Sequence, residues 1–575
     1  MKLMLRYVRR HLGMFLTAIF FLTIETLADL LQPTFMSFIV DEGVAKRDVR
    51  QILFYGGIML GIAALGAFGA VMRNIYASRT SQLIGKEMRM EIYEKVQTLS
   101  FENIDRLQPS SIITRITNDV TQIQNFLNGC MRIMMKAPIT CVGAIVLIIV
   151  QTPQQLPMIV VILLISAFLI AGNMKLGYPR FGILQRKLDR LNAVSREFLS
   201  SIRVVKAFRA EEREEEKFAD AAGDFAQAGV SAMRIMAVFG PLINLTVNLG
   251  IVVLLWISQT GNGGEIGRLM ASVNYMTQVL FSLGMVSNIL NMAVRALASS
   301  ARVEEVLKEK PVQELPEQGA GPADIRGQVT FERVSFTYAS TSRPAAEDVS
   351  FQAEAGETIG IIGPTGSGKS TLMDLVPRFY DATSGRVKID GTDVREIDPG
   401  RLRRAIAVVP QKALLFSGSI LENLRWGDER ASEEDVKKAA CIACANEFVS
   451  AFPNGYETDL SQGGVNLSGG QKQRLSIARA LVRKPRILIL DDCTSALDAN
   501  TEARVLQGIR QETADMTVLL ISQRISTVMR ADRILCLEDG RVKGFGSHQE
   551  LLEQCAVYRA IYESQIGAAG APAGR

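Results

Sequence analysis

Long apolar runs dominate the first half of the chain, whereas later residues alternate short apolar runs with helical patterns. A helix needs about 20 consecutive apolar residues to cross a membrane. Six runs reach or approach that length, and we expect six transmembrane helices: Gly13–Val40, Ile52–Val71, Met131–Val150, Leu156–Ala171, Ile235–Ile257 and Leu269–Ala293. The fourth run is short, so its helix is expected to extend beyond Ala171.

Basic residues flank these runs unevenly. Four of them precede the first span, and the second–third and fourth–fifth connections, each roughly 60 residues, are rich in Lys and Arg. The positive-inside rule therefore predicts that both termini are cytoplasmic. Within these connections, Arg79–Ser100 and Leu184–Phe218 have helical periodicity. They predict helical arms below the membrane, with turns near Pro109–Ser111 and Ser200–Ser201.

The pattern changes after the sixth span. Residues 309–327 hold three prolines and three glycines without periodicity, which is typical of a linker. Residues 328–566 alternate strand and helix patterns, as in a mostly parallel α/β domain. We therefore expect a membrane domain over 1–308, a linker over 309–327, an α/β domain over 328–566 and a disordered tail over 567–575.

Composition supports a membrane protein with a soluble part. Of 575 residues, 48% are hydrophobic and 21% charged, and the mean hydropathy is +0.17. These values exclude a disordered or collagen-like chain. The net charge of +5, from 64 basic and 59 acidic residues, is too balanced to indicate nucleic-acid binding. Seven scattered cysteines indicate no disulfide framework.

A glycine-rich loop carries the most specific chemistry. The apolar run Thr358–Ile362 predicts a strand, the loop follows it, and a helix opens near Thr371. Backbone amides of such a loop wrap phosphate oxygens. Lys369 is expected to reach the β- and γ-phosphates, and the Ser370 hydroxyl to bind Mg²⁺. We therefore predict a site for ATP and Mg²⁺, formed by Gly363, Gly366, Ser367, Gly368, Lys369, Ser370 and Thr371.

Two further motifs follow this loop. Asp491 and Asp492 end the apolar run from Ile487, where a carboxylate can bind Mg²⁺ at the edge of a sheet; the alternative is that both carboxylates cap the next turn. The string Leu467–Gln471, with a helix after it, offers a second phosphate-binding surface. Taken alone, such a string is most often a turn.

Together these motifs resemble the ATP-binding cassette (ABC) transporters, in particular exporters with six spans fused to one nucleotide-binding domain. The resemblance covers nearly the whole chain. It implies a membrane α-helical bundle fused to a cytoplasmic α/β P-loop nucleotide-binding domain. In this family two cassettes enclose two ATP molecules, and each site combines one chain's phosphate loop with the other chain's signature.

The resemblance also implies roles for individual residues. Tyr338 matches the aromatic residue that stacks on adenine, and Gln411 matches the glutamine that binds Mg²⁺ and contacts the coupling helices. Asp491 matches the Mg²⁺-binding aspartate. The signature contributes Ser468, Gly469, Gly470 and Gln471 to the partner's site, and Asp498 lies in the loop that links the two sites.

Two positions depart from the family pattern. The family has Glu directly after the Mg²⁺-binding Asp, where this chain has Asp492, and a switch His where this chain has Gln523. Asp is one methylene shorter than Glu and holds its carboxylate farther from the attacking water. Gln cannot carry the proton or charge of imidazole. We therefore expect a site that binds Mg-ATP well and hydrolyses it slowly.

An intact signature beside an impaired site is typical of the degenerate subunit of heterodimeric bacterial multidrug exporters. We expect ATP-driven export of small amphipathic or drug-like molecules across a bacterial inner membrane, with a second half-transporter chain as partner and no nucleic acid. The alternatives are a homodimer in which both substitutions are tolerated, an ATP-gated channel or regulatory subunit without pumping, and an importer-like member of the same fold.

Polar residues within the spans are candidates for a substrate cavity in the lipid-embedded part. Glu25 and Asp29 lie four residues apart, hence on one helix face, and either attract cationic substrates or form structural hydrogen bonds. For the amides, contacts between helices are an equal alternative. These candidates are Asn244, Asn248, Asn288 and Asn291.

Overall fold

A computed structural model describes residues 2–153, 156–260, 266–314, 316, 319–512 and 515–567. The chain divides into two compact units. The helical unit comprises Met1–Gln97 and Ser110–Lys308, and the α/β unit comprises Thr98–Pro109 and Glu309–Arg575. The short segment 98–109 therefore packs with the α/β unit although it lies within the helical part of the sequence.

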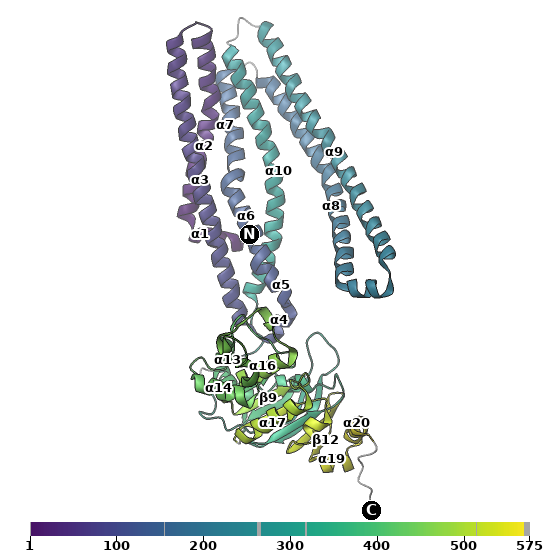
Figure 1. Ribbon diagram of the computed structural model, residues 1–575. Helices are drawn as coiled ribbons and strands as arrows, with labels where there is room; N and C mark the ends of the chain where they lie inside the picture. The colour runs from purple at the N-terminus through teal and green to yellow at the C-terminus, as the bar shows by residue number, and fades with distance from the viewer. Residues whose placement is uncertain are drawn as a thin grey trace, which may run out of the picture. The chain divides into compact units, whose positions relative to one another are not determined.

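The helical unit consists of long helices joined by short connections (Figure 1). Its α-helices are α1 (Lys2–Arg10), α2 (Leu12–Phe38), α3 (Val49–Gln97), α5 (Pro109–Thr114), α6 (Val120–Gly129), α7 (Lys136–Gln151), α8 (Leu156–Phe208), α9 (Glu211–Thr260) and α10 (Ile266–Lys308). Three π-helical turns, η1 (Ile39–Val44), η2 (Arg115–Asp119) and η3 (Cys130–Met134), continue these helices without breaking them.

Five segments of the described chain are long and apolar enough to cross a membrane: Leu12–Val44, Val49–Gln97, Pro109–Gln151, Val160–Phe208 and Glu211–Val253. They contain the first three predicted spans entirely and most of the fourth and fifth. The sixth predicted span, Leu269–Ala293, lies within α10, which is not among these five segments. Polar residues such as Asn274 and Gln278 interrupt the apolar residues of α10.

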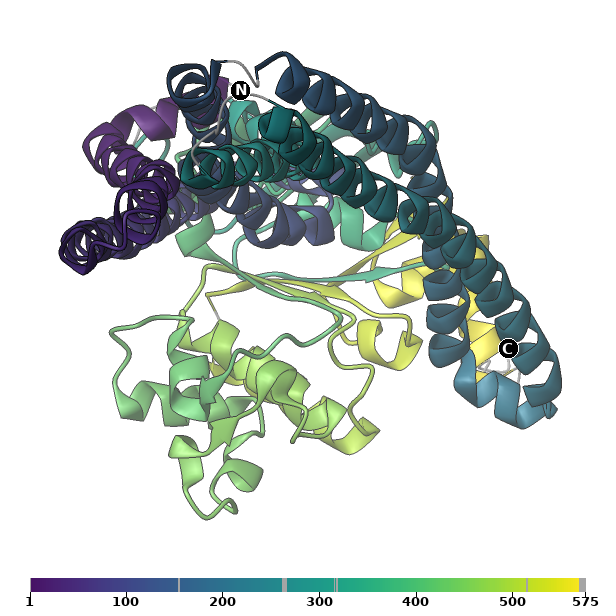
Figure 2. The same ribbon diagram turned by 90° about the horizontal axis from the view of Figure 1, so that it is seen from above.

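Helices α8 and α9 form an antiparallel pair that runs side by side in both views (Figures 1 and 2). As predicted, α8 extends beyond Ala171 and reaches Phe208. The predicted turn at Ser200–Ser201 is wrong, because both hydroxyls donate to the Glu197 carbonyl within a continuous helix. The chain turns instead at Arg209, whose φ is 51°.

The α/β unit contains three sheets. The main sheet has the order β12-β11-β3-β10-β9-β6, and all neighbouring pairs are parallel except β11 with β12. An antiparallel sheet has the order β2-β1-β4-β5, and β7 pairs with β8. The strands are β1 (Val329–Phe336), β2 (Ala346–Ala353), β3 (Thr358–Ile362), β4 (Ser384–Ile389), β5 (Thr392–Asp393), β6 (Ile406–Val409), β7 (Gly418–Ser419), β8 (Asp459–Leu460), β9 (Ile487–Asp491), β10 (Thr517–Ile521), β11 (Arg533–Glu538) and β12 (Arg541–Gly546).

The α/β unit also contains α-helices. They are α11 (Lys369–Asp374), α12 (Pro399–Ala405), α13 (Ile420–Arg425), α14 (Glu433–Ile442), α15 (Asn446–Val449), α16 (Gly469–Val482), α17 (Ala499–Glu512), α18 (Ile525–Val528), α19 (His548–Gln554) and α20 (Ala556–Ile566), with α4 (Phe101–Leu107) from the inserted segment. Alternate residues of β9 pack into two different cores, Leu488 and Leu490 into one and Ile487 and Ile489 into the other. Burial on both faces explains why this strand is continuously apolar.

Helix α4 is anchored to the α/β unit by Asn103, which is fully buried. Its amide nitrogen donates to the Glu309 carboxylate at 2.6 Å and to the Lys310 carbonyl at 2.9 Å. Its amide oxygen accepts from the Val312 backbone at 3.1 Å. Beside it, the Tyr380 hydroxyl donates to Asp105 at 2.6 Å. The start of the linker therefore binds this helix through side-chain hydrogen bonds.

Candidate nucleotide site

The parallel strands β3, β9 and β10 are neighbours in the main sheet, so the residues that follow them meet at one edge. The glycine-rich loop follows β3, Asp492 follows β9, and Gln523 comes two residues after β10. The loop needs glycine where its backbone is left-handed: φ of Gly368 is 89°, and a Cβ there would lie 2.1 Å from the Ala345 carbonyl oxygen.

Lys369 opens helix α11 and is buried within the loop. Its ammonium group donates to the carbonyls of Gly363 at 2.9 Å and Pro364 at 2.8 Å. Burial lowers the pKa of Lys369, and the nearby carboxylates of Asp492 and Asp491 oppose that shift. A positive charge is thus held in the same loop as the backbone amides that can bind phosphate oxygens.

Oxygen atoms suited to Mg²⁺ come together beside the loop. The Ser370 hydroxyl donates to the Asp491 carboxylate at 2.9 Å. Burial raises the pKa of Asp491. Mg²⁺ is usually held by one or two carboxylates together with phosphates and water, rather than by a full cage of protein ligands. In the described residues, no group of three or more His, Cys, Asp or Glu could hold a metal ion.

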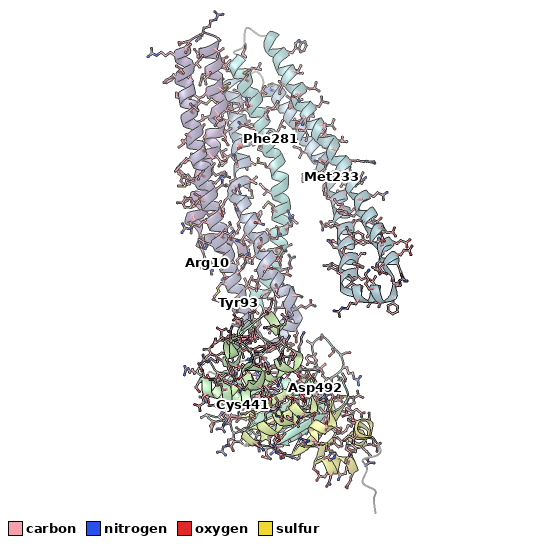
Figure 3. The ribbon with its side chains drawn as sticks, viewed as in Figure 1. Arg10, Tyr93, Met233, Phe281, Cys441 and Asp492 are labelled. Carbon is pink, nitrogen blue, oxygen red and sulfur yellow. The ribbon has the colours of Figure 1, made fainter. Side chains whose placement is uncertain are left out.

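Asp492 contacts both Gln411 and Gln523 (Figure 3 labels Asp492). Its carboxylate accepts from the Gln411 amide at 3.2 Å and from the Gln523 amide at 3.4 Å. Burial raises the pKa of Asp492, and hydrogen bonds from the Gln523 backbone and the Gln411 side chain act in the opposite direction. The backbone φ of Asp492 is 43°, a left-handed conformation in which Asp is enriched relative to longer side chains. Asp492 and Gln523, the two positions at which the sequence departs from the family pattern, are therefore hydrogen-bonded to each other.

Tyr338 lies beyond the end of β1, and its hydroxyl is 3.1 Å from that of Thr371. Its ring meets Phe336 edge to face, with the centroids 4.8 Å apart. Tyr380 packs in the same way at 5.5 Å. Burial raises the pKa of Tyr338. These contacts fix the ring beside the helix that follows the phosphate loop.

The signature begins helix α16. Ser468 is its N-cap. The Ser468 hydroxyl accepts from the backbone N–H of Gln471 at 3.3 Å, and the side-chain oxygen of Gln471 accepts from the backbone N–H of Ser468 at 2.9 Å. Ser468 and Gly469 are exposed. A Cβ at Gly470 would lie 3.2 Å from the Ala496 carbonyl oxygen, so the signature adjoins the loop that contains Asp498. Both segments can therefore present polar groups to another chain.

The candidates in the spans are arranged around ion pairs. Glu25 is buried, and its two oxygens meet Arg73 at 2.7 Å and Lys136 at 2.8 Å. Asp29 also pairs with Lys136, at 2.9 Å, and both line a cavity of about 250 Å³. Phe281, which is labelled in Figure 3, lines the same cavity. These contacts favour the structural alternative for Glu25.

Of the four asparagine candidates, the structure describes the side chains of Asn244 and Asn248. Asn244 and Asn248 are exposed on α9, where the Asn248 amide donates to the Asn244 carbonyl at 2.9 Å. The side chains of Asn288 and Asn291 lie outside those that the structure describes. A cavity role for these four residues stays a prediction.

Comparison with known proteins decides the family. Residues 15–283 match the model of the ABC transporter transmembrane region, and residues 346–495 match the ABC transporter model. The chain is 40% identical, over 96% of both chains, to an uncharacterized ABC transporter ATP-binding protein, YfiB, of Bacillus subtilis. The chain belongs to the ABC transporter family. Its predicted fold, a membrane helical region followed by an α/β nucleotide-binding domain, is confirmed.

Two further similarities describe this ABC half-transporter. It is similar in structure to a bacterial Atm1-family ABC exporter with ATP bound, with a TM-score of 0.77, 26% identity and 99% of each chain covered. It is 32% identical to a multidrug efflux ATP-binding/permease protein of Mycobacterium bovis, over 96% of this chain and 46% of that one. The half-transporter is thus of the exporter type.

Sequence reasoning missed several polar residues that hold the site of this half-transporter together. The Gln565 side chain on α20 accepts from the Ile525 amide at 2.8 Å and donates to the Gln523 carbonyl at 2.7 Å. The Gln473 side chain donates to the Gln411 carbonyl at 3.3 Å and accepts from the Ala496 amide at 3.2 Å. The sequence gives no signal for such contacts, because each joins positions far apart along the chain.

Proposed function

We propose that this chain is one half of a heterodimeric ABC exporter for small amphipathic or drug-like molecules. Its own site binds Mg-ATP and hydrolyses it slowly, and its signature, Leu467–Gln471, completes the working site of a partner half-transporter. We further propose a bacterial inner membrane as its location, with both termini cytoplasmic. The observation that carries the proposal is the contact between Asp492 and Gln523.

Chemical reasoning connects this contact to slow hydrolysis. Phosphoryl transfer to water depends on positioning and on stabilising charge. A short carboxylate that accepts hydrogen bonds from Gln411 and Gln523 is a poor general base for a distant water. A misplaced base forfeits much of the roughly 10²–10⁴-fold gain of general base catalysis. Ser370, Asp491 and Gln411 would supply oxygen ligands to Mg²⁺. The bound ion would neutralise charge on the phosphates.

Exposed apolar side chains support the proposal that this chain binds a partner chain. Phe208 at the end of α8 is 80% exposed, and Leu199 is 66% exposed. Large apolar side chains that are exposed at the end of a helical arm are compatible with contact to another protein surface. In the α/β unit, a groove of about 550 Å³ presents Phe416, Trp426 and Arg479, and we propose that a helical segment of the partner's membrane domain docks there.

Steady-state ATP hydrolysis tests the proposal. We expect the purified chain to hydrolyse ATP at least about 100-fold more slowly than the chain co-purified with its partner. Replacing the partner's catalytic Glu should abolish the activity of the pair, whereas Asp492→Ala should leave most of it. Brisk hydrolysis by the chain alone would reject the heterodimer and favour the homodimer.

Transport itself needs a separate assay. We expect ATP-dependent accumulation of a fluorescent amphipathic dye in inside-out vesicles that contain both chains, against the dye gradient. If dye moves only down its concentration gradient, and only when ATP is present, the result would instead indicate an ATP-gated channel. Flux in the opposite direction would indicate an importer.

A further inference from the structure

A buried carboxylate outside the family motifs joins the loops around the nucleotide site. Glu502, in the first turn of α17, is 6% exposed. One of its oxygens accepts from the hydroxyls of Thr494 at 2.6 Å and Thr527 at 2.8 Å. The other oxygen accepts from the Arg524 guanidinium at 3.0 Å. One side chain thus receives three hydrogen bonds, one from the loop after β9 and two from the segment after β10 that includes the start of α18.

Both loops carry residues of the site. Thr494 comes two residues after Asp492, and Arg524 directly follows Gln523. The second terminal nitrogen of Arg524 donates to the Ser495 carbonyl at 3.0 Å, and its first donates to the Leu497 carbonyl at 3.4 Å. Through Arg524, the Glu502 carboxylate therefore fixes the backbone of the loop that ends at Asp498.

Stability alone does not explain a buried carboxylate here. Removing a carboxylate from water is costly, and its ion pair often stabilises a protein no better than apolar side chains of similar size. Hydrogen bonds to a charged acceptor, in contrast, are short and directional. Glu502 is therefore suited to setting the relative position of the two loops rather than to strengthening the core.

We propose that Glu502 is a positioning residue for ATP hydrolysis. It holds Arg524, and through it the loop 495–498, in the orientation that the site across the dimer requires. The inference rests on the proposed function, because it assumes that this loop and the signature complete a site on another chain. ATP bound at this chain's own phosphate loop does not depend on Glu502.

The test is Glu502→Gln in the full chain, measured in whichever assembly hydrolyses ATP. An amide at this position keeps the size of the side chain but turns an N–H group toward Arg524 or toward the two hydroxyls. We expect kcat to fall about 10- to 100-fold, as for a displacement near 1 Å. The Kd for Mg-ATP should change little. The melting temperature should fall less than for Glu25→Gln, because the Arg524 side chain is 43% exposed and stays solvated, whereas that of Arg73 is 10% exposed. Arg510 lies on the same helix as Glu502, and Arg510→Gln removes only an exposed ion pair with Asp532. This variant is the matched control and should leave kcat unchanged.

Two further variants separate positioning from folding. Thr527→Val removes one hydroxyl at nearly constant volume and should lower kcat about 2- to 10-fold. Arg524→Gln should lower kcat as Glu502→Gln does, and the double variant should be no worse than either, because both act through one contact. Such non-additivity would not arise from two independent losses of stability.

The outcomes divide cleanly. A kcat of Glu502→Gln within twofold of the unmodified chain overturns the inference, and so does a loss of kcat that parallels a lower melting temperature and weaker ATP binding. Additive effects of Glu502→Gln and Arg524→Gln also overturn it. If the chain alone hydrolyses ATP briskly, the heterodimer fails, but Glu502→Gln is then measured in the homodimer and still decides the role of Glu502.

Discussion

Replacing Glu25 by Gln tests the ion-pair cluster among α2, α3 and α7. In the native chain two carboxylates, Glu25 and Asp29, face two cations, Arg73 and Lys136. Glu25 bridges both cations, whereas Asp29 contacts Lys136 alone among them. Removing the Glu25 charge therefore leaves Arg73, whose side chain is 10% exposed, without its carboxylate.

The size of the effect follows from burial. Removing one partner of a buried ion pair costs about 3–5 kcal/mol, and an uncompensated charge at the centre of a membrane helix costs about 2.5–3.5 kcal/mol. We expect Glu25→Gln to destabilise the chain by about 3 kcal/mol. Asp29→Asn should cost at most about 1 kcal/mol, because the Asp29 side chain is 42% exposed and Lys136 keeps Glu25.

The assay is the apparent melting temperature in one detergent at one scan rate, since membrane proteins often unfold irreversibly. Glu25→Gln should lower it by about 5–10 °C. The double variant Glu25→Gln with Arg73→Gln should recover most of that loss, because it removes the orphaned cation as well. Equal small shifts for Glu25→Gln and Asp29→Asn, or a double variant less stable than either single one, would refute the reasoning. If Glu25→Gln instead abolished export of a cationic dye at unchanged stability, the result would favour a role for Glu25 in attracting cationic substrates.

Three further predictions concern the α/β unit. Burial and the charges of Asp491 and Asp105 raise the pKa of Asp374 to about 6. The folded state then binds this proton more tightly than the unfolded state, so the group favours folding below about pH 4 and this contribution is lost as pH rises through 6. Asp374→Asn should therefore raise the melting temperature more at pH 7.5 than at pH 4.5; an equal gain at both would contradict this. Lys369→Met should weaken binding of a fluorescent ATP analogue at least about 10-fold, with Lys388→Met as control. Asn103→Ala should lower stability by about 2–4 kcal/mol in denaturant unfolding, and an effect below 1 kcal/mol would refute the anchoring role.

Most of the fold could be predicted because helices, strands and the phosphate loop each leave a pattern in neighbouring residues. Apolar runs of membrane length located the helices, and a strand–loop–helix pattern located the phosphate loop at Gly363–Thr371. The turn at Ser200–Ser201 failed because serine hydroxyls can also bond back to the helix carbonyls, as both do to Glu197. Such residues mark a turn only where the backbone itself breaks.

The remainder of the candidate site depends on distant contacts. Glu502 lies in an ordinary helix, and its role appears only when Thr494 and Thr527 lie beside it. Asn103 binds residues more than 200 positions away along the chain. Pairing between Glu25 and Arg73 likewise depends on how α2 packs on α3. No spacing rule within one sequence reveals such partners.

The exposed apolar tip of the α8–α9 pair bears on the cellular fate of the protein. ABC exporters work as dimers of half-transporters, and a newly made copy exposes Phe208 and Leu199 before it assembles. Chaperones and membrane proteases recognise exposed hydrophobic segments of this kind. An unassembled copy would therefore be short-lived, and in the proposed heterodimer degradation of orphan subunits would keep the two chains at matched abundance.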